Sequence, residues 1–531
     1  MEERMKKGLL LLFLAVFICF TVTAGGGSQS SSVSTAKPVL SGFGYVSARL
    51  MVSVTNFNEN YAFQELERAT GVHVDWFHPP VGQHTEQASL IIASGDLPDI
   101  FYIPYNDVGG LAKMLSDGTI IKLNQYLDTG KMPHYKSWVD KYPTLRRQLL
   151  MDDGTCAAFL MLRIREYMGQ IGWFPNGGLV LRRDWLDALN LQAPTTVAEY
   201  ENVLRAFKTR NPNGSGRNDV IPLVTDATNW SNFAQFFGMN DGFYELNGAV
   251  RYGPIEPRYR DYMTTMARWQ RDGLIDPDWT TANATSMQAK YLENRAGSHY
   301  TVVAAAGNII EIMRDTIPNA DFIGVRHLKN ESDGKVYNNT ADLRQSFVHE
   351  GSVISTQCKN VDAALRYLDY SYSPEGYTFF NWGELGVSYE VRNGEKFYTD
   401  EIWKNPKGYS MEKALHMYAM SMCQWSMPKD PVYWVQASLR FPFQEEALNN
   451  WGNVDHAIAM LPVSFTTEES RRYNQLIADI NTLRAETATK IILGTEPVSA
   501  LDAMVTRMKS MGIDEAIKIQ QDALNRYNAR R

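Results

Sequence analysis

The sequence predicts an α/β protein that contains at least two α/β regions. Apolar, strand-like segments alternate with amphipathic helical segments near the start of the chain, and the same alternation begins again at residues 178–181. The composition is that of a globular chain, because 44% of the 531 residues are hydrophobic and 21% are charged. A chain of this length can form two or more lobes with sizeable cores.

The first α/β region is predicted from four segments. Residues 49–54 (RLMVSV) are expected to form a strand, and residues 61–70 a helix that ends at Gly71. Residues 72–76 alternate apolar and polar side chains, which predicts a second strand. Residues 90–103 (LIIASGDLPDIFYI) run from a helix end through a turn into another apolar strand. This order predicts a parallel sheet with helices on both faces.

The second α/β region begins with a strand at residues 178–181, which leads into a helix at residues 184–186. Thr196 and Glu199 have the spacing of a capping box, so another helix is expected to start there and to stop at Asn211. The apolar residues of that helix share one face: Val197, Tyr200, Val203, Leu204 and Phe207.

The remainder of the chain mixes strands and helices without an internal repeat. Residues 322–357 have a strand-like composition, and helices follow them. Near the C-terminus, one helix is expected over residues 501–511, closed by Gly512. A final helix is expected to start after Asp514 and to reach Asn528.

The N-terminal residues predict an export signal. Residues 1–24 combine a basic start, an apolar run too short for a comfortable membrane span, and a small-residue exit. A buried helix is the alternative, but the position at the very start favours export. Residues 25–39 form a flexible tether like that of bacterial lipoproteins. Gly25 stands where those proteins carry the lipid-bearing cysteine, so the sequence leaves open whether this extracellular or cell-surface protein is anchored or released.

Charge and cysteine content exclude some classes of partner. The formal charge is −7, and no basic block occurs beyond the N-terminus, which argues against a nucleic-acid partner. The four cysteines are widely scattered and form no CxxC or Cys/His cluster, so we expect neither a disulfide framework nor a cysteine metal site. Buried, apolar thiols are the interpretation for Cys156, Cys358 and Cys423.

Several segments, spread over most of the chain beyond residue 40, resemble those of a known family. They are ASGDLPDIF (93–101), DGTIIKLNQYLD (117–128), residues 179–222, DGLIDPDW (272–279), residues 372–391 and residues 492–528. On these segments the sequence resembles the extracellular solute-binding proteins of sugar ABC transporters. The resemblance is greatest to the large lipoprotein branch that includes alginate- and oligosaccharide-binding members.

This resemblance implies a two-lobed periplasmic-binding-protein-like fold with a hinge and a ligand cleft between the lobes. It places lobe one at residues 40–170 and 322–385, and lobe two at residues 171–321 and 386–531. It also implies a monomer that captures an oligosaccharide and delivers it to the permease subunits of an ABC transporter in the membrane. Ligands of open α/β sheets bind beyond the carboxyl ends of the strands, which agrees with such a cleft.

The stretch NPNGSGRNDVIP (211–222) occupies the place where relatives similar to alginate-binding proteins carry a calcium loop. The matching positions are Asn211, Asn213, Ser215, the carbonyl of Arg217, and Asp219. Asn211 replaces an expected aspartate and Val220 an expected glutamate, so only one carboxylate remains. Calcium affinity follows carboxylate count, so we expect a hydrogen-bonded polar turn. No cofactor is required; calcium stays open as a weakened, bracing ligand.

A sugar-binding site needs aromatic planes for the C–H faces of the ligand and fixed polar groups for its hydroxyls. Five tryptophans beside turn residues are candidates, with packing under a loop as the alternative for each: Trp173, Trp230, Trp279, Trp382 and Trp434. The polar candidates follow predicted strands or could bind a carboxylate: Asn56, Asn58, Tyr102 and Arg344. A structural salt bridge is the alternative for Arg344.

Three other functions are alternatives to oligosaccharide capture. An enzyme is disfavoured because no GxSxG, HExxH, Walker-type or GxGxxG motif is present. A glycosidase would need a carboxylate pair such as Asp276 with Asp278 or Glu384 with Glu390, whose separation the sequence does not give. A peptide ligand on the same fold stays open, although the loop tryptophans favour sugar. The sequence does not distinguish a sensory role from a role in transport.

Overall fold

The structure is a computed structural model. It describes residues 37–46, 51, 53–163, 166–167, 170–171, 177–339, 347–421 and 425–530. The expected signal and nearly all of the expected tether therefore lie outside the described residues. Within the described part of the chain, no helix combines the length and the apolar character needed to cross a bilayer.

The first sheet has five strands in the order β2-β1-β3-β14-β4. The strands are β1 (Val39–Gly44), β2 (His73–Phe77), β3 (Ile100–Ile103), β4 (Phe159–Leu162) and β14 (Phe347–Ile354). β1 pairs in parallel with β2 and β3, whereas β14 pairs antiparallel with β3 and β4. The sheet is therefore mixed, and only its β2-β1-β3 half has the parallel pairing that was expected.

The first strand lies earlier than the sequence predicted. β1 is Val39–Gly44, whereas Met51 and Ser53 of the expected strand are in turns. Two glycines weaken the strand-like appearance of β1. One of them is required by packing, because a Cβ on Gly42 would lie 2.5 Å from the ring of Trp76 on β2. Close approach of an aromatic ring to the backbone is a tertiary constraint that strand propensity does not express.

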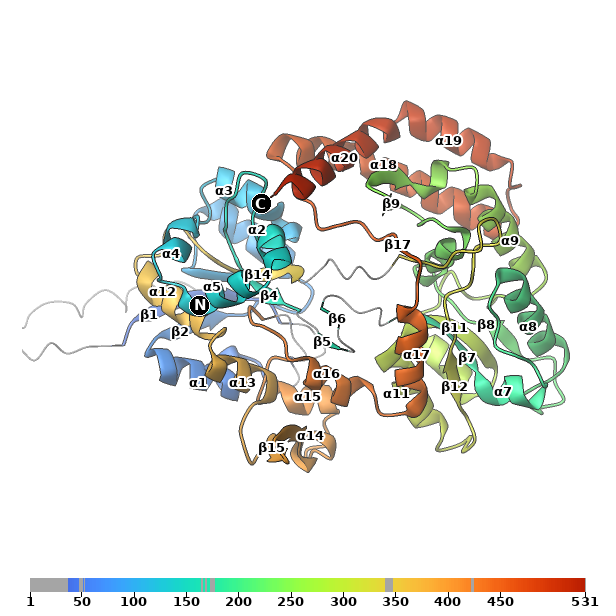
Figure 1. Ribbon diagram of the computed structural model, residues 1–531, viewed down its shortest axis with the longest axis horizontal. Coiled ribbons are helices and arrows are strands. Elements are labelled where there is room, and N and C mark those ends of the chain that lie inside the picture. The colour runs from blue at the N-terminus through green and yellow to red at the C-terminus, as the bar shows by residue number, and fades with distance from the viewer. Residues whose placement is uncertain are drawn as a thin grey trace, which may run out of the picture. The chain divides into compact units, whose positions relative to one another are not determined.

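Helices of the first region pack around this sheet. They are α1 (Tyr61–Thr70), α2 (His84–Ser94), α3 (Gly110–Ser116), α4 (Asn124–Asp128), α5 (Pro133–Lys141), α6 (Pro143–Leu149), α12 (Val361–Tyr370) and α13 (Pro374–Trp382), with 3-10 turns at Phe57–Glu59 and Tyr105–Val108. The predicted bounds of α1 and the predicted strand at β2 are confirmed. α1 lies beside α12 and α13 (Figure 1).

An aromatic cluster fills the core of this region. The ring of Trp425 lies 4.8 Å from that of Phe63, 5.0 Å from that of Tyr102 and 5.8 Å from that of Phe57. Trp425 belongs to the segment 386–531 that was expected to lie wholly in lobe two. That boundary is corrected, because this part of the chain returns to complete the first core.

The second sheet has four strands in the order β12-β7-β11-β8. They are β7 (Gly177–Arg182), β8 (Ile221–Leu223), β11 (Ala296–Val302) and β12 (Phe322–Gly324). β7 pairs antiparallel with β11 and β12, and β11 pairs in parallel with β8. The carboxyl ends of β8, β11 and β12 therefore share one edge of this sheet.

The helix predicted after the capping box is α8 (Val197–Thr209), and all five residues of its expected apolar face are buried. The Thr196 hydroxyl accepts a hydrogen bond from the N–H of Glu199, as expected. The Glu199 carboxylate reaches Thr195, one residue earlier than in a capping box, and accepts its N–H and its hydroxyl proton. Both interactions satisfy donors at the helix start.

The remaining helices of the second half include three long C-terminal ones that pack together (Figure 1). Helices not yet given are α7 (Arg183–Ala188), α9 (Tyr259–Arg271), α10 (Ala284–Leu292), α11 (Val303–Met313), α14 (Asp400–Trp403), α15 (Met411–His416), α16 (Pro431–Ser438), α17 (Pro442–Gly452), α18 (Thr467–Ile492), α19 (Ala500–Ser510) and α20 (Ile513–Ala529), with 3-10 turns at Asn229–Phe237 and Gly253–Ile255. The two predicted C-terminal helices are confirmed to within one or two residues at each end.

Short two-stranded pairs complete the fold. They are β5 (Glu166–Tyr167) with β6 (Gln170–Ile171), β9 (Phe243–Leu246) with β10 (Ala249–Tyr252), β13 (Tyr337–Asn338) with β17 (His456–Ala457), and β15 (Tyr389–Arg392) with β16 (Glu395–Tyr398). The expected buried thiols are confirmed for Cys156 and Cys358, while Cys423 lies outside the described residues.

Asp369 joins α12 to the start of α5 and offers a test of the first core. Its buried carboxylate accepts the N–H of Tyr135 at 2.7 Å and that of His134 at 3.2 Å. Asp369→Ala should lower the free energy of unfolding by about 1–3 kcal/mol, because two amides at a helix N-terminus lose their acceptor. Urea denaturation of the purified protein would measure the change.

Asp362 on the same helix is the matched control. Its side chain is 66% exposed and pairs with Lys131 at 2.7 Å. Because surface ion pairs contribute little, Asp362→Ala should cost about 0.5 kcal/mol or less. Equal losses in the two variants would show that the Asp369 carboxylate does not cap α5.

Candidate functional site

A cavity of about 760 Å³ lies against the turn that follows β3. One wall is made by residues 105–117, by residues 148–151 at the end of α6, and by Leu160 of β4. The other wall is made by residues 462–474, which include the start of α18. The volume is in the range of small-molecule sites, which hold ligands of sugar size.

The position of the cavity follows from the topology of the first sheet. β3 ends at Ile103, and Tyr105, two residues later, lines the cavity. β1 and β3 are parallel, so their carboxyl ends meet at this edge. Ligands of open α/β sheets bind beyond such carboxyl ends, because there the chain turns away and leaves a crevice.

The lining combines aromatic rings with hydrogen-bonding side chains. The rings of Phe465 and Tyr473 lie 4.9 Å apart at an interplanar angle of 44°, and Tyr105 adds a third ring. The polar lining residues carry amides, hydroxyls and charges: Lys113, Asp117, Gln148, Ser464, Thr467, Ser470, Arg471 and Asn474. Flat apolar rings beside such groups match the C–H faces and hydroxyls of a sugar. The described lining contains no histidine that could act as a general base and no cysteine that could act as a nucleophile.

The shared edge of the second sheet contains buried polar atoms without partners. Thr225 follows β8 and His327 follows β12, and within the described chain neither the Thr225 hydroxyl nor Nδ1 of His327 has a hydrogen-bond partner. The other ring nitrogen of His327 accepts from the Asn338 amide at 2.9 Å, and burial lowers the pKa of His327 to about 3, so the ring is neutral. Unpartnered buried groups are uncommon, and at 2% and 1% exposure Thr225 and His327 are covered from a ligand, so an ordered water is their expected partner.

The tryptophans expected to bind ligand are buried wherever the structure describes their side chains. Trp279 and Trp382 are each 1% exposed, and Trp230 is 4% exposed. The indole N–H of Trp382 donates to Asp430 at 2.8 Å, and that of Trp230 donates to the carbonyl of Ala227. A ring covered on both faces cannot stack on a sugar, so the expected ligand role of these three is corrected to a packing role.

The polar candidates near the first sheet are also structural. Asn56 Nδ2 donates to the carbonyl of Trp76, and Asn58 Nδ2 to that of Val74, each at 3.0 Å, which attaches the segment after β1 to β2. Tyr102 is buried in the aromatic cluster around Trp425. These amides and this ring are occupied by the fold, which corrects the expectation that they face ligand.

Three further candidates are not placed by the structure. Trp173 and Arg344 lie outside the described residues. Trp434 lies in α16, but its side chain is outside the described part. Their expected roles stay predictions.

The rings that do line the cavity were missed at the sequence level. Phe465 directly precedes the Thr466–Glu469 capping box of α18, and Tyr473 lies two turns into that helix. Tyr105 follows a proline at the end of an apolar strand. An aromatic residue next to an element boundary was the available signal, but only the fold brings residues 105 and 465 together.

One member of each carboxylate pair that glycosidase chemistry would need is engaged in an ion pair of its own. Asp276 is fully buried, and its carboxylate accepts from Lys290 at 2.5 Å. Glu390 pairs with Arg392 on its own hairpin. A buried, salt-bridged carboxylate cannot reach a glycosidic bond, so Asp276 has the turn role that was its simpler interpretation.

The loop at residues 211–219 closes through its own hydrogen bonds. Asp219 Oδ1 accepts from Asn213 Nδ2 at 3.0 Å and from the Ser215 hydroxyl at 2.9 Å. These two hydrogen bonds hold the pKa of Asp219 below its ordinary value, and the bond from Asn213 makes the larger contribution. Oxygen donors of the type that calcium prefers surround this one carboxylate, but a donor set with a single charge fits the ion weakly. No cluster of three or more His, Cys, Asp or Glu side chains suited to a metal occurs among the described residues.

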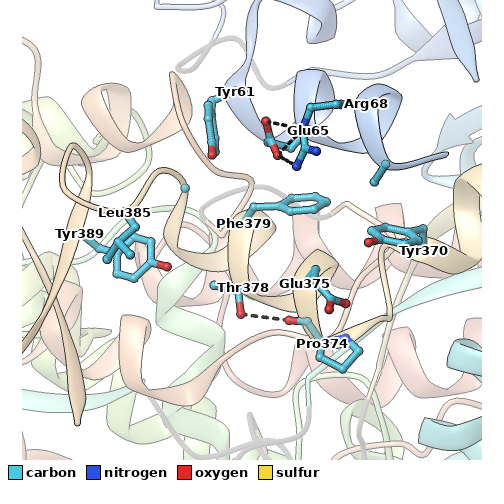
Figure 2. A pocket seen from close by; sticks show the side chains of 12 residues that line it. Tyr61, Glu65, Arg68, Tyr370, Pro374, Glu375, Thr378, Phe379, Leu385 and Tyr389 are labelled. Carbon is cyan, nitrogen blue, oxygen red and sulfur yellow. Dashed lines mark hydrogen bonds and ion pairs between the residues drawn. The ribbon is translucent and has the colours of Figure 1, made fainter. Parts of the chain in front are cut away.

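A second hollow, of about 470 Å³, lies between α1 and α13 (Figure 2). Tyr61, Glu65 and Arg68 of α1 face Phe379 of α13 across it. Arg68 pairs with Glu65 at 2.5 Å on its rim. Helices and the turn after α13 form this hollow, whereas the cavity beyond β3 lies at a strand end and is larger. The cavity beyond β3 is therefore the stronger candidate site.

Comparisons with known proteins agree on one class. The family model described as "Bacterial extracellular solute-binding protein" matches residues 56–378. The fructooligosaccharide ABC transporter substrate-binding protein FusA of Streptococcus pneumoniae is 27% identical over 350 residues, which span 64% of this chain and 63% of that protein. Lipoprotein LipO of Bacillus subtilis is 21% identical over 528 residues, 98% of each chain.

Solved structures share the fold. The crystal structure of alginate-binding protein AlgQ2 without calcium ion superposes with a TM-score of 0.74 at 24% sequence identity, covering 94% of this chain and all of that one. The two-lobed fold expected from the sequence is confirmed by this likeness.

The calcium expectation is testable by thermal unfolding. A loop with one carboxylate should bind calcium no more tightly than about 10⁻³ M. At 1 mM calcium the protein would then gain only about 0.4 kcal/mol, so its Tm should differ from that in chelator by under about 2 °C.

Restoring charge to the loop provides the comparison. Asn211→Asp adds a second carboxylate beside that of Asp219, and this variant should show a larger rise in Tm with calcium than the unsubstituted protein. A fall of many degrees when chelator is added to the unsubstituted protein would contradict the weakened site.

Proposed function

The chain belongs to the bacterial extracellular solute-binding protein family, and we propose that its ligand is an oligosaccharide bound in the cavity beyond β3. The observation that carries the proposal is the lining of that cavity. Phe465 and Tyr473 offer apolar ring surface, and amide, hydroxyl and charged side chains surround them. Peptide ligands rely on hydrogen bonds along their backbone, whereas adjacent rings suit the C–H faces of sugars.

The comparisons support a sugar ligand. One relative is a fructooligosaccharide-binding component of an ABC transporter, and a structural neighbour binds alginate. These two glycans differ in charge, since fructooligosaccharides are neutral and alginate is acidic. Lys113 and Asp117 in the lining pair with each other, and Arg471 adds a positive charge, so the cavity is compatible with a neutral or an acidic glycan.

Capture works by a population shift. A ligand that touches groups on both sheets favours the closed form by its differential affinity. In the proposed cavity such a ligand contacts both walls, residues 105–117 and residues 462–474. The protein itself supplies no chemistry, and a membrane permease with its ATPase subunits performs transport. The chain acts outside the cytoplasmic membrane, as members of the family do.

The proposal is tested by titrating the mature protein with neutral fructooligosaccharides and with oligomers of alginate and polygalacturonate. Isothermal calorimetry and intrinsic tryptophan fluorescence should both show saturable binding to one of these glycan classes. Product analysis should find the bound glycan unchanged after prolonged incubation. If none of the three glycan classes binds in either measurement, oligosaccharide binding is contradicted. Cleavage of the glycan would contradict a pure binding role.

Phe465 provides a site-directed test. Phe465→Ala should weaken glycan binding by about 1–3 kcal/mol, which is roughly 5- to 150-fold in Kd, because an aromatic platform is lost. Phe77→Ala is the control, since this ring on β2 is 48% exposed and does not line the cavity. Equal Kd values for the Phe465 variant and the control would remove Phe465 from the site.

A further inference from the structure

Two arginines near the C-terminus converge on one carboxylate next to the cavity. Arg526, on α20, donates to Asp152 Oδ2 at 2.5 Å through Nε. Arg530, just beyond α20, donates to Asp152 Oδ1 at 2.9 Å through Nε and at 2.5 Å through a terminal nitrogen. Asp152 lies 374 and 378 positions earlier in the sequence. We name Asp152, Glu469, Arg526 and Arg530 the C-terminal clasp.

The same arginines also bind the opposite wall segment. Arg526 forms a two-pronged pair with Glu469, at 2.9 and 2.6 Å, and Arg530 donates to the Ser464 hydroxyl at 2.8 Å. Arg530 further donates to the carbonyl of Arg147 at 3.2 Å. Each guanidinium thus contacts both segments at once. Its several N–H donors, fixed in one plane, make this possible, whereas the single ammonium group of a lysine would not reach both segments in this way.

The clasp is partly removed from water and balanced in charge. The side chain of Arg530 is 4% exposed, and that of Asp152 is 18% exposed. Burial alone would raise the pKa of Glu469, but hydrogen bonds from Arg526 and from the Thr466 N–H lower it below its ordinary value. Two cations and two carboxylates compensate one another, so the clasp avoids an unpaired buried charge.

The clasp adjoins both walls of the cavity. Asp152 directly follows Met151, which lines the first wall. Ser464 lines the second wall, and Glu469 lies between the lining residues Thr467 and Ser470. The clasp is therefore connected to both walls through adjacent residues.

We propose that Arg526 and Arg530 are positioning residues that hold the walls of the cavity at the spacing its ligand requires. The inference rests on the proposed function, and it gives Arg526 and Arg530 an effect on ligand affinity without contact to the ligand. A site held in its bound geometry loses less freedom on binding, so breaking the clasp lowers affinity without removing any group that touches the ligand.

The first test compares glycan affinities by calorimetry, using the glycan class that the unsubstituted protein binds. Arg530→Gln should raise Kd roughly tenfold, mainly through faster dissociation. Asp152→Asn should act in the same direction, and the double variant should lose less than the product of the two single effects, because both break one interaction.

Arg472→Gln is the matched control. Arg472 on α18 forms a two-pronged pair with Glu515 on α20, at 2.7 and 2.5 Å, so it joins the same two helices without contacting residues 147–152. Its Kd should stay within about twofold of the unsubstituted value, since exposed pairs contribute little. If Arg530→Gln fails to fold, Arg530→Lys replaces it in the test. Lysine keeps the positive charge but cannot form the paired, planar hydrogen bonds of the guanidinium.

Amide hydrogen exchange without glycan supplies a readout that does not depend on the ligand. In Arg530→Gln, exchange should accelerate at residues 148–151 and 464–470, with little change in the distant helix α8. Unchanged exchange at both walls, or a Kd equal to that of Arg472→Gln, would overturn the inference. If the unsubstituted protein binds no glycan, the proposed function fails, and the clasp then has no ligand role.

Discussion

The packing of Trp425 against Phe57, Phe63 and Tyr102 is the interaction on which the first half of the structure depends. Through it, α1, the turn before α1 and β3 share one core with a segment that returns from far along the chain. Large aromatic rings contribute much of the apolar area that a core buries. Fixing β3 also fixes Tyr105 and the cavity edge, so the core and the candidate site are parts of one construction.

Burial also explains which tryptophans are available to a ligand. Loop tryptophans are attractive as stacking platforms, but Trp230, Trp279 and Trp382 are covered by the cores beneath their loops. The rings that remain partly open, Phe465 and Tyr473, lie at the start of a long helix. A helix start can present a ring and still cap itself, because Thr466 and Glu469 satisfy its first amides.

Glu469 therefore takes part in two interactions, a helix cap and an ion pair. It caps α18 through Thr466, and it accepts both prongs of the Arg526 guanidinium. The end of the chain, the start of α18 and the loop around Asp152 are thereby fixed to one another. Charge-assisted hydrogen bonds with planar geometry are suited to this, since they restrict orientation as well as distance.

The sequence alone determined the elements whose pattern is local. The amphipathic faces of α1 and α8, the glycine that ends α1, and the alternation in β2 all follow from side-chain periodicity and capping, and the structure has them where they were predicted. The polar loop at residues 211–219 was likewise predictable, because its hydrogen bonds join residues at most six positions apart. The fold class followed from the order of these elements and from the resemblance.

Only the tertiary structure decided which residues form the site. β1 contains glycines, and its strand exists because Trp76 packs over Gly42. The cavity joins residue 105 to residue 465, and the clasp joins Asp152 to Arg530, 378 positions away. Local propensity has no information about such pairs, because their free energy comes from burial and hydrogen bonding between segments that meet only when both cores have formed.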